Sequence, residues 1–179
     1  MFQQVCHVGK LFGLPDASVR EAKERVRTAI KNSGVEFQSR RIVVNLSPAD
    51  IRKEGTIFDL PIAVGILQNF GVIKRTNNEN IIYVGELSLD GRINRVDGIL
   101  PICIEARKLG IKKVILPKMN AKEGAIVQDI EIIGVETLTD VVKYFNQEKN
   151  ISKETVDLKS IFSNQCEDGM DFKASTGRP

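Results

Sequence analysis

The stretch Asn80–Leu116, NIIYVGELSLDGRINRVDGILPICIEARKLGIKKVIL, decides the fold class of this chain. Its first half contains two runs rich in β-branched residues, 80–89 and 92–96, on either side of the dipeptide Asp90-Gly91. This dipeptide tolerates positive φ at both central positions of a type I′ turn. The sequence therefore predicts a β-hairpin centred on Asp90-Gly91.

The second half of the stretch predicts a helix followed by a strand. Asp97 can cap a helix over 98–109, in which Pro101 falls in the first turn, where its missing amide hydrogen is not needed. Gly110 supplies a left-handed residue to end that helix. The apolar run 113–116 then predicts a short buried strand.

The same alternation continues on both sides of this stretch. Downstream, the pattern predicts a short helix over 120–127, a strand over 131–135 and a helix capped by Thr137 that runs through 145. Upstream, it predicts a helix over 19–33, a buried strand over 41–46 and a buried helix over 60–70 with Asp59 as its N-cap. Alternating strands and helices indicate an α/β fold.

Boundaries follow from changes in composition and from local signals for helix ends. Ser18 and Glu21 have the spacing of a capping box, and Gly34 supplies a C-cap for the first helix. The chain is therefore predicted to consist of an atypical leader, one folded domain and a polar, weakly ordered linker or tail, at residues 1–13, 14–146 and 147–179.

Composition narrows the class of protein. Hydrophobic residues make up 42% and charged residues 27% of the 179 residues, which is ordinary for a globular domain. There is no apolar run long enough for a membrane helix or a signal peptide, so we expect a cytoplasmic protein without a membrane partner. The three cysteines, Cys6, Cys103 and Cys166, are far apart and lack the spacing of a zinc or redox motif, so we expect no metal site.

Three stretches together resemble the ComM/YifB family of magnesium-chelatase-like proteins. They are GLPDASVREAKERVRTAIKNSG, RIVVNLSPADIRKEGTIFDLPIAVGIL and VGELSLDGRINRVDGILP, and the resemblance extends over about residues 13–146. It implies the fold of the Lon protease catalytic domain, which a ribosomal protein also has, with a mixed sheet and helices in two layers. Members of this family carry the domain ahead of an AAA+ ATPase module, assemble as hexamers and act on branched DNA.

The resemblance also bears on chemistry. It places Asp59 and Leu100 where Lon proteases have their serine nucleophile and lysine base, and neither side chain can perform those steps. We therefore expect no catalytic residue in this chain, and Asp59 is explained as a helix cap that stabilises by about 0.5–2 kcal/mol. A metal-binding or acid–base role for Asp59, with Asp50, Glu54 or Glu86, is the alternative for that carboxylate.

Nucleotide binding is also not expected here. No G-x-x-x-x-G-K-[ST] loop occurs, so ATP and Mg²⁺ are expected only in the ATPase module that the resemblance implies. The expected partners are that module, sister subunits and DNA. A fragment of a magnesium-chelatase-like subunit and a Lon-like serine peptidase are the alternative functions.

Two groups of residues are candidates for contact with partners. A basic stripe on the first helix, extended at the next strand, could contact phosphates, and it consists of Arg20, Lys23, Arg27, Lys31, Arg40 and Arg41. A solvated face with ion pairs to Glu21 and Glu24 is the alternative interpretation. The charged loop between two buried elements is the candidate partner loop, with Asp50, Arg52, Lys53 and Glu54.

Overall fold

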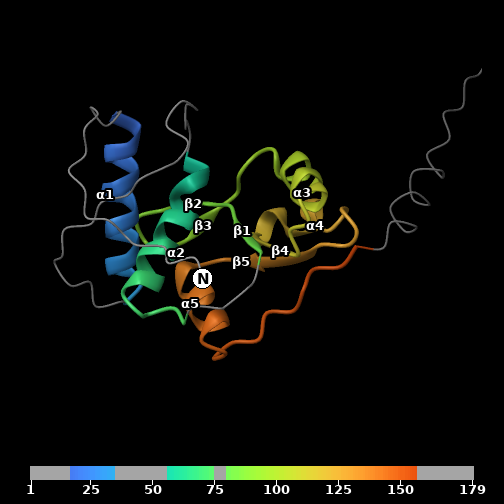
Figure 1. Ribbon diagram of the computed structural model, residues 1–179. Helices are drawn as coiled ribbons and strands as arrows, with labels where there is room; N and C mark the ends of the chain where they lie inside the picture. Colours follow the sequence, from blue (N-terminus) through green and yellow to red (C-terminus); the bar gives the residue numbers. More distant parts are fainter. Residues whose placement is uncertain (1–16, 35–55, 75–79, 157–179) are drawn as a thin grey trace, which may run out of the picture.

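A computed structural model describes residues 17–34, 56–74 and 80–156 (Figure 1). The helices are α1 (Ala17–Asn32), α2 (Asp59–Asn69), α3 (Ile99–Lys108), α4 (Ala121–Gly124) and α5 (Leu138–Phe145), with short 3-10 turns η1 (Thr56–Phe58) and η2 (Lys118–Asn120). The strands are β1 (Ile81–Tyr83), β2 (Glu86–Leu87), β3 (Ile93–Asn94), β4 (Lys113–Pro117) and β5 (Glu131–Val135). The leader 1–13, the strand expected over 41–46 and the candidate partner loop lie outside the described residues.

Strands β1, β4 and β5 form a parallel sheet in that order within the described ranges. Ile82 lies opposite Val114, and Val114 lies opposite Ile132, which fixes the register across the sheet. Helix α3 lies between β1 and β4 in the chain, and α4 lies between β4 and β5. Parallel neighbours require such crossovers, so the predicted α/β class is confirmed.

Helices cover both faces of this sheet. Successive residues along β4 and β5 point to opposite faces, and each face packs in its own hydrophobic core. Ile115 and Ile133 pack in one core with α1, α2 and α5. Val114 and Ile132 belong to a second core with α3 and α4. Figure 1 shows α5 on one side of the sheet and α3 and α4 on the other. The described part thus has helices on both faces of the parallel sheet.

The strand predicted over 80–89 is divided between two sheets. Its first part is β1 of the parallel sheet, and its second part, β2, pairs antiparallel with β3. Gly85 lies at the break, where a Cβ atom would come within 2.9 Å of the Ile93 side chain. The amide of Leu60 also donates to the Gly85 carbonyl at 3.0 Å. The approach of α2 to the backbone therefore redirects the strand at this glycine.

The hairpin prediction is confirmed, but its turn type is wrong. Only Gly91 in the loop has positive φ, at 85°, and the Ser88 amide donates to the Arg92 carbonyl at 2.9 Å. These features describe a three-residue loop whose last residue is left-handed. The Asp90 carboxylate accepts the Arg92 amide at 3.1 Å, as in an Asx turn.

The predicted helix ends are correct in some places and wrong in others. Thr137 and Asp140 form a capping box at the start of α5, and Gly34 and Gly110 have positive φ as expected of residues that end helices. Asp97 does not cap α3. The N-cap residue of α3 is Gly98, which has no side chain to accept a hydrogen bond. The Leu100 amide donates instead to the Glu123 carboxylate at 3.2 Å. A side chain from α4 therefore replaces the local cap.

Candidate nucleic-acid and partner interface

Helix α1 lies at one end of the domain and buries one side (Figure 1). Val26, Ala29 and Ile30 are fully buried in the core shared with α2 and α5. The helix therefore presents its opposite side away from the domain, as its apolar spacing predicts.

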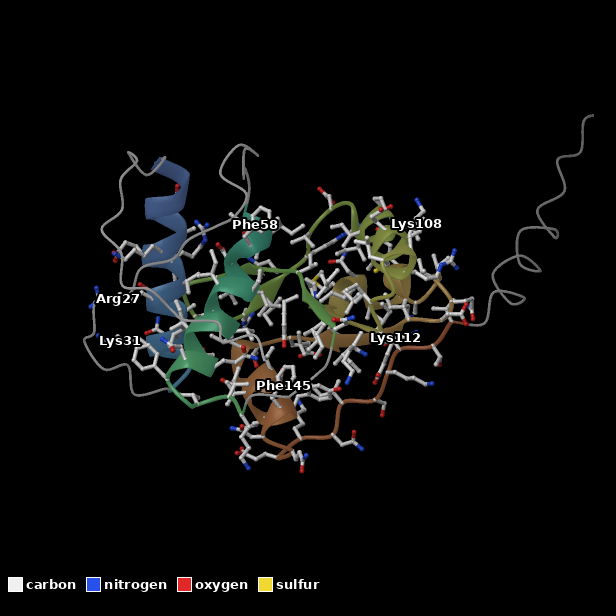
Figure 2. All side chains as sticks on the ribbon, viewed as in Figure 1. Arg27, Lys31, Phe58, Lys108, Lys112 and Phe145 are labelled. Carbon is white, nitrogen blue, oxygen red and sulfur yellow. The ribbon has the colours of Figure 1, made fainter. Side chains whose placement is uncertain are left out.

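The basic residues of α1 occupy that outer side. Lys23, Arg27 and Lys31 are exposed, and Figure 2 shows Arg27 and Lys31 on the side of α1 away from the other helices. At 1.5 Å per residue their four-residue spacing places them about 6 Å apart along the axis. Arg20 belongs to α1, but its side chain lies outside the described part, as do Arg40 and Arg41. The structure thus brings together three of the six predicted basic side chains.

The alternative interpretation of the basic stripe, a solvated face with internal ion pairs, depends on the acidic residues of α1. Glu21 pairs with Arg25, with 3.2 Å between a carboxylate oxygen and the guanidinium Nη1. Arg25 is not part of the basic stripe, so this contact does not use one of its charges. Glu24 is exposed on the same helix and reduces the positive field there.

Asp59 is not an N-cap, and this corrects the sequence-based prediction. It is the first residue of α2, after Phe58, and it is completely buried. Arg25 Nε lies 2.6 Å from its Oδ2 atom, and Arg25 Nη2 lies 3.1 Å from Oδ1. The Leu87 amide donates to Oδ2 at 3.2 Å. A single carboxylate thus joins α1, α2 and β2, and a buried charge requires such partners.

The electrostatic consequence appears at Arg25. The hydrogen bond to Asp59 raises the pKa of the guanidinium above its ordinary value, and this outweighs the opposing effect of burial. Because the carboxylate already accepts three hydrogen bonds from protein donors, the geometry supports a structural role for Asp59. Sequence reasoning missed Arg25, whose partner is 34 residues away. The available signal was a carboxylate at the start of an almost wholly apolar helix, which needs a cation if it is buried.

A second polar group lies beside this ion pair. The Glu86 carboxylate accepts hydrogen bonds from the Thr56 hydroxyl and, at 3.3 Å, from Asn94 Nδ2. Thr56 directly follows the candidate partner loop in sequence. Thr56, the first described residue after that loop, is therefore held against the β2–β3 hairpin, whereas Asp50, Arg52, Lys53 and Glu54 lie outside the described residues.

The second position named by the resemblance, Leu100, belongs to the other core. Its side chain is half-buried and packs against the cluster that contains α3 and α4. Cys103 on the same helix is fully buried, and burial raises the pKa of its thiol to about 11, as is typical of a core cysteine.

No group of three or more histidine, cysteine or acidic side chains in the described ranges is arranged to hold a metal ion. None of the helices described is both long and apolar enough to cross a bilayer.

Comparison with known proteins identifies the family. The family described as subunit ChlI of Mg-chelatase matches residues 2–120. The chain belongs to this family. It is 39% identical over 170 residues to the competence protein ComM of Haemophilus influenzae, a match that covers 87% of the chain and 33% of that protein. The chain thus spans about a third of the length of this ChlI-family relative.

Two further relatives are similar to parts of the chain. YifB of Escherichia coli is 40% identical over 117 residues, which covers 65% of the chain and 23% of YifB. The DNA repair protein RadA of Halalkalibacterium halodurans is 34% identical over 113 residues, with coverage of 63% and 24%. The resemblance to the ComM/YifB group is confirmed. The part matched by the ChlI family includes α1 and the Arg25–Asp59 pair, whereas β5 and α5 lie beyond it.

Proposed function

We propose that this chain is a noncatalytic, DNA-contacting and assembly domain of a ComM-like AAA+ ATPase, with the fold of the Lon protease catalytic domain. Support comes from relatives named as a competence protein and a DNA repair protein, and from the shared ChlI family. The positions that the resemblance assigns to a peptidase dyad hold an ion-paired Asp59 and an apolar Leu100. ATP and Mg²⁺ would belong to the ATPase module, and the protein would act in the cytoplasm.

The observation that carries this proposal is that the basic residues of α1 lie on two sides of the helix and make different contacts. Among the α1 side chains that the structure describes, Arg25 faces inward and holds the helix in place, while Lys23, Arg27 and Lys31 lie on the outer side. A rigidly held helix can offer these charges to a nucleic acid without first ordering its backbone. The fixed orientation therefore favours a binding surface over a merely solvated one.

The mode of contact follows from the residue types. Lysine and arginine bind phosphates, and α1 carries no aromatic side chain on which an unpaired base could stack. We therefore propose contact with the DNA backbone without reading of bases. Such binding weakens as salt rises, with a slope of log K against log[salt] of about −0.9 per phosphate neutralised.

Fluorescence anisotropy with a labelled DNA duplex and a labelled four-way junction tests this proposal. The triple variant Lys23→Glu, Arg27→Glu, Lys31→Glu should lose most of its affinity for both and flatten the salt slope by up to about 3. The matched control reverses the charge of three exposed basic residues at the other end of the domain, in the variant Arg107→Glu, Lys112→Glu, Lys122→Glu. Equal losses in both variants, or no loss in the first, would remove α1 from the proposed interface.

The partner surface is the second part of this proposal. The loop with Asp50, Arg52, Lys53 and Glu54 would contact the ATPase module or a sister subunit; support comes from its charged composition and from Thr56, the next residue but one after Glu54, which bonds to Glu86 of the hairpin. Reversing Arg52 and Lys53 to glutamate should weaken association with the separately expressed ATPase module in a pull-down. Retained association would assign that role elsewhere.

A magnesium-chelatase subunit is a second candidate, because the matching family carries that description. This function would act on a porphyrin and would not require DNA. Titration with protoporphyrin separates the two: a shift of the porphyrin absorption band without DNA binding favours the chelatase subunit, and the reverse favours the ComM-like function. A third candidate, the Lon-like peptidase, predicts cleavage of unfolded casein.

A further inference from the structure

Residues 147–156 lack helix and strand, yet they follow a defined path against the domain. The segment begins with Gln147, whose φ of 61° reverses the chain after α5. The amides of Glu148 and Lys149 then donate to the Lys143 carbonyl at 2.8 and 3.2 Å. The chain therefore leaves α5 through a hydrogen-bonded turn.

Two ion pairs hold the segment at separate places. Lys149 Nζ lies 2.7 Å from Oδ1 of Asp140 on α5, and Lys118 Nζ lies 2.8 Å from Oε2 of Glu154. In each pair the carboxylate side chain is largely covered, with 16% exposed for Asp140 and 17% for Glu154. Partly covered carboxylates are less screened by solvent than fully exposed ones.

The segment also crosses the edge of the sheet. The Glu154 amide donates to the carbonyl of Ile132, on the outermost described strand, at 2.8 Å. Ile151 packs against the core that contains α1, and Val156 packs against the core that contains α3. An uncovered strand edge can pair with another chain, so this segment protects β5.

The contact is made at separate points, with open space between them. A cavity of about 520 Å³ lies between residues 153–156 and the loop 125–131. The segment is therefore held by a few defined contacts, and these can be tested one at a time.

We propose that residues 147–156 are a strap that ties the carboxyl-terminal continuation of the chain to the β5 edge at a fixed place. Figure 1 shows the end of this segment at the side of the domain opposite α1. A module that follows the strap is then held away from the basic face of α1, in a set orientation. The sequence predicts a linker here, and a freely moving linker would give no such relation.

Amide exchange and limited proteolysis of the 179-residue protein test the strap directly. The Glu154 amide should exchange slowly by NMR, and trypsin should cut slowly after Lys149 and Lys153. Lys118→Glu should speed cleavage at Lys153 by about fivefold, because it places like charges together and favours the undocked segment. Glu154→Lys should speed exchange of the amide at residue 154, a measurement that the new tryptic site at this position does not affect.

Two further variants complete the design. The exchanged pair Lys118→Glu with Glu154→Lys should restore slow amide exchange at residue 154, and Lys122→Glu, on a neighbouring exposed lysine, should leave both exchange and cleavage unchanged. Rapid exchange of the Glu154 amide in the unaltered protein would overturn the proposal, as would single variants that behave like the unaltered protein. The outcome is independent of DNA binding, which none of these measurements involves.

Discussion

Helix α1 and the strap 147–156 are both peripheral segments, but they are attached by different physics. Helix α1 is held by fully buried apolar residues and by a carboxylate with no solvent exposure, Asp59. The strap is held by ion pairs whose lysines are about half exposed and by one hydrogen bond to the sheet edge. Buried charge pairs are costly to break from one side, whereas exposed pairs contribute little each. The comparison indicates that α1 is fixed and that the strap can be released.

The largest effect is expected at Asp59. Asp59→Asn keeps the shape of the side chain but leaves the Arg25 guanidinium without its counter-charge, and should cost about 3 kcal/mol, the lower end for a broken buried pair. Urea unfolding of both proteins measures the loss. The double variant Arg25→Met, Asp59→Leu is the control and should recover most of the stability. A loss well below 1 kcal/mol for Asp59→Asn would show that the pair does not hold α1.

The next effect concerns the strand beside the strap. A Cβ atom at Gly134 would lie 2.8 Å from the Ala121 Cβ and 3.2 Å from the Lys118 backbone. Gly134→Ala should therefore cost about 1–3 kcal/mol through overpacking, and should also speed tryptic cleavage of the strap by shifting Lys118. Gly65→Ala is the matched control: that helical position has open space, and the change should stabilise by about 0.5–1 kcal/mol. In thermal unfolding, the melting temperature should fall for Gly134→Ala and rise for Gly65→Ala.

Salt should weaken the attachment of the strap more than that of α1, with a smaller effect than the substitutions above. At about 1 M salt the Debye length falls to about 3 Å, which screens exposed charges but reaches buried ones much less. Sodium chloride should therefore accelerate cleavage after Lys149 and Lys153 without loosening α1. Amide exchange in α1 provides the comparison. Equal sensitivity of both segments to salt would show that α1 and the strap are not attached by different kinds of contact.

The smallest effect is expected from pH. Burial tends to raise the pKa of Asp140, but hydrogen bonds from Lys149 and Thr137 outweigh it and hold that pKa below the usual 3.8. The same contact raises the pKa of Lys149, with a weaker contribution from Glu136. Because the folded-state pKa of Asp140 is lowered, its stabilisation is present above pH 3.8 and is lost as pH falls through the lower value. Strap protection followed by amide exchange should decline in that range, and Asp140→Asn should remove this part of the decline.

The sequence predicts the elements of this fold better than their connections. Regular spacing of apolar residues is enough to predict α1 and α5, because each buries one stripe. The apolar run 60–70 predicts α2, which is buried over only part of its surface. The break at Gly85 could not be predicted, since the residues around it read as one continuous strand until α2 approaches the backbone. Propensity describes single elements and carries no information about such contacts.

The candidate interface shows the same limit. The basic stripe is visible in the sequence because helical spacing alone places Lys23, Arg27 and Lys31 on one side. The partner of Asp59 is not visible, because Arg25 is brought to it by the packing of two helices. The strap has too few apolar residues to predict order, and its attachment depends on Asp140 and Lys118 of other elements.

The burial of Cys103 provides an internal reporter of opening. Its thiol faces the Gly124 backbone beneath α3, and a pKa of about 11 keeps it almost entirely protonated at neutral pH. The thiolate is the form that attacks iodoacetamide, displacing iodide, so the native protein should resist alkylation at this position. Timed addition of iodoacetamide followed by peptide mass analysis would then give the rate at which helix α3 separates from the sheet, without any engineered label.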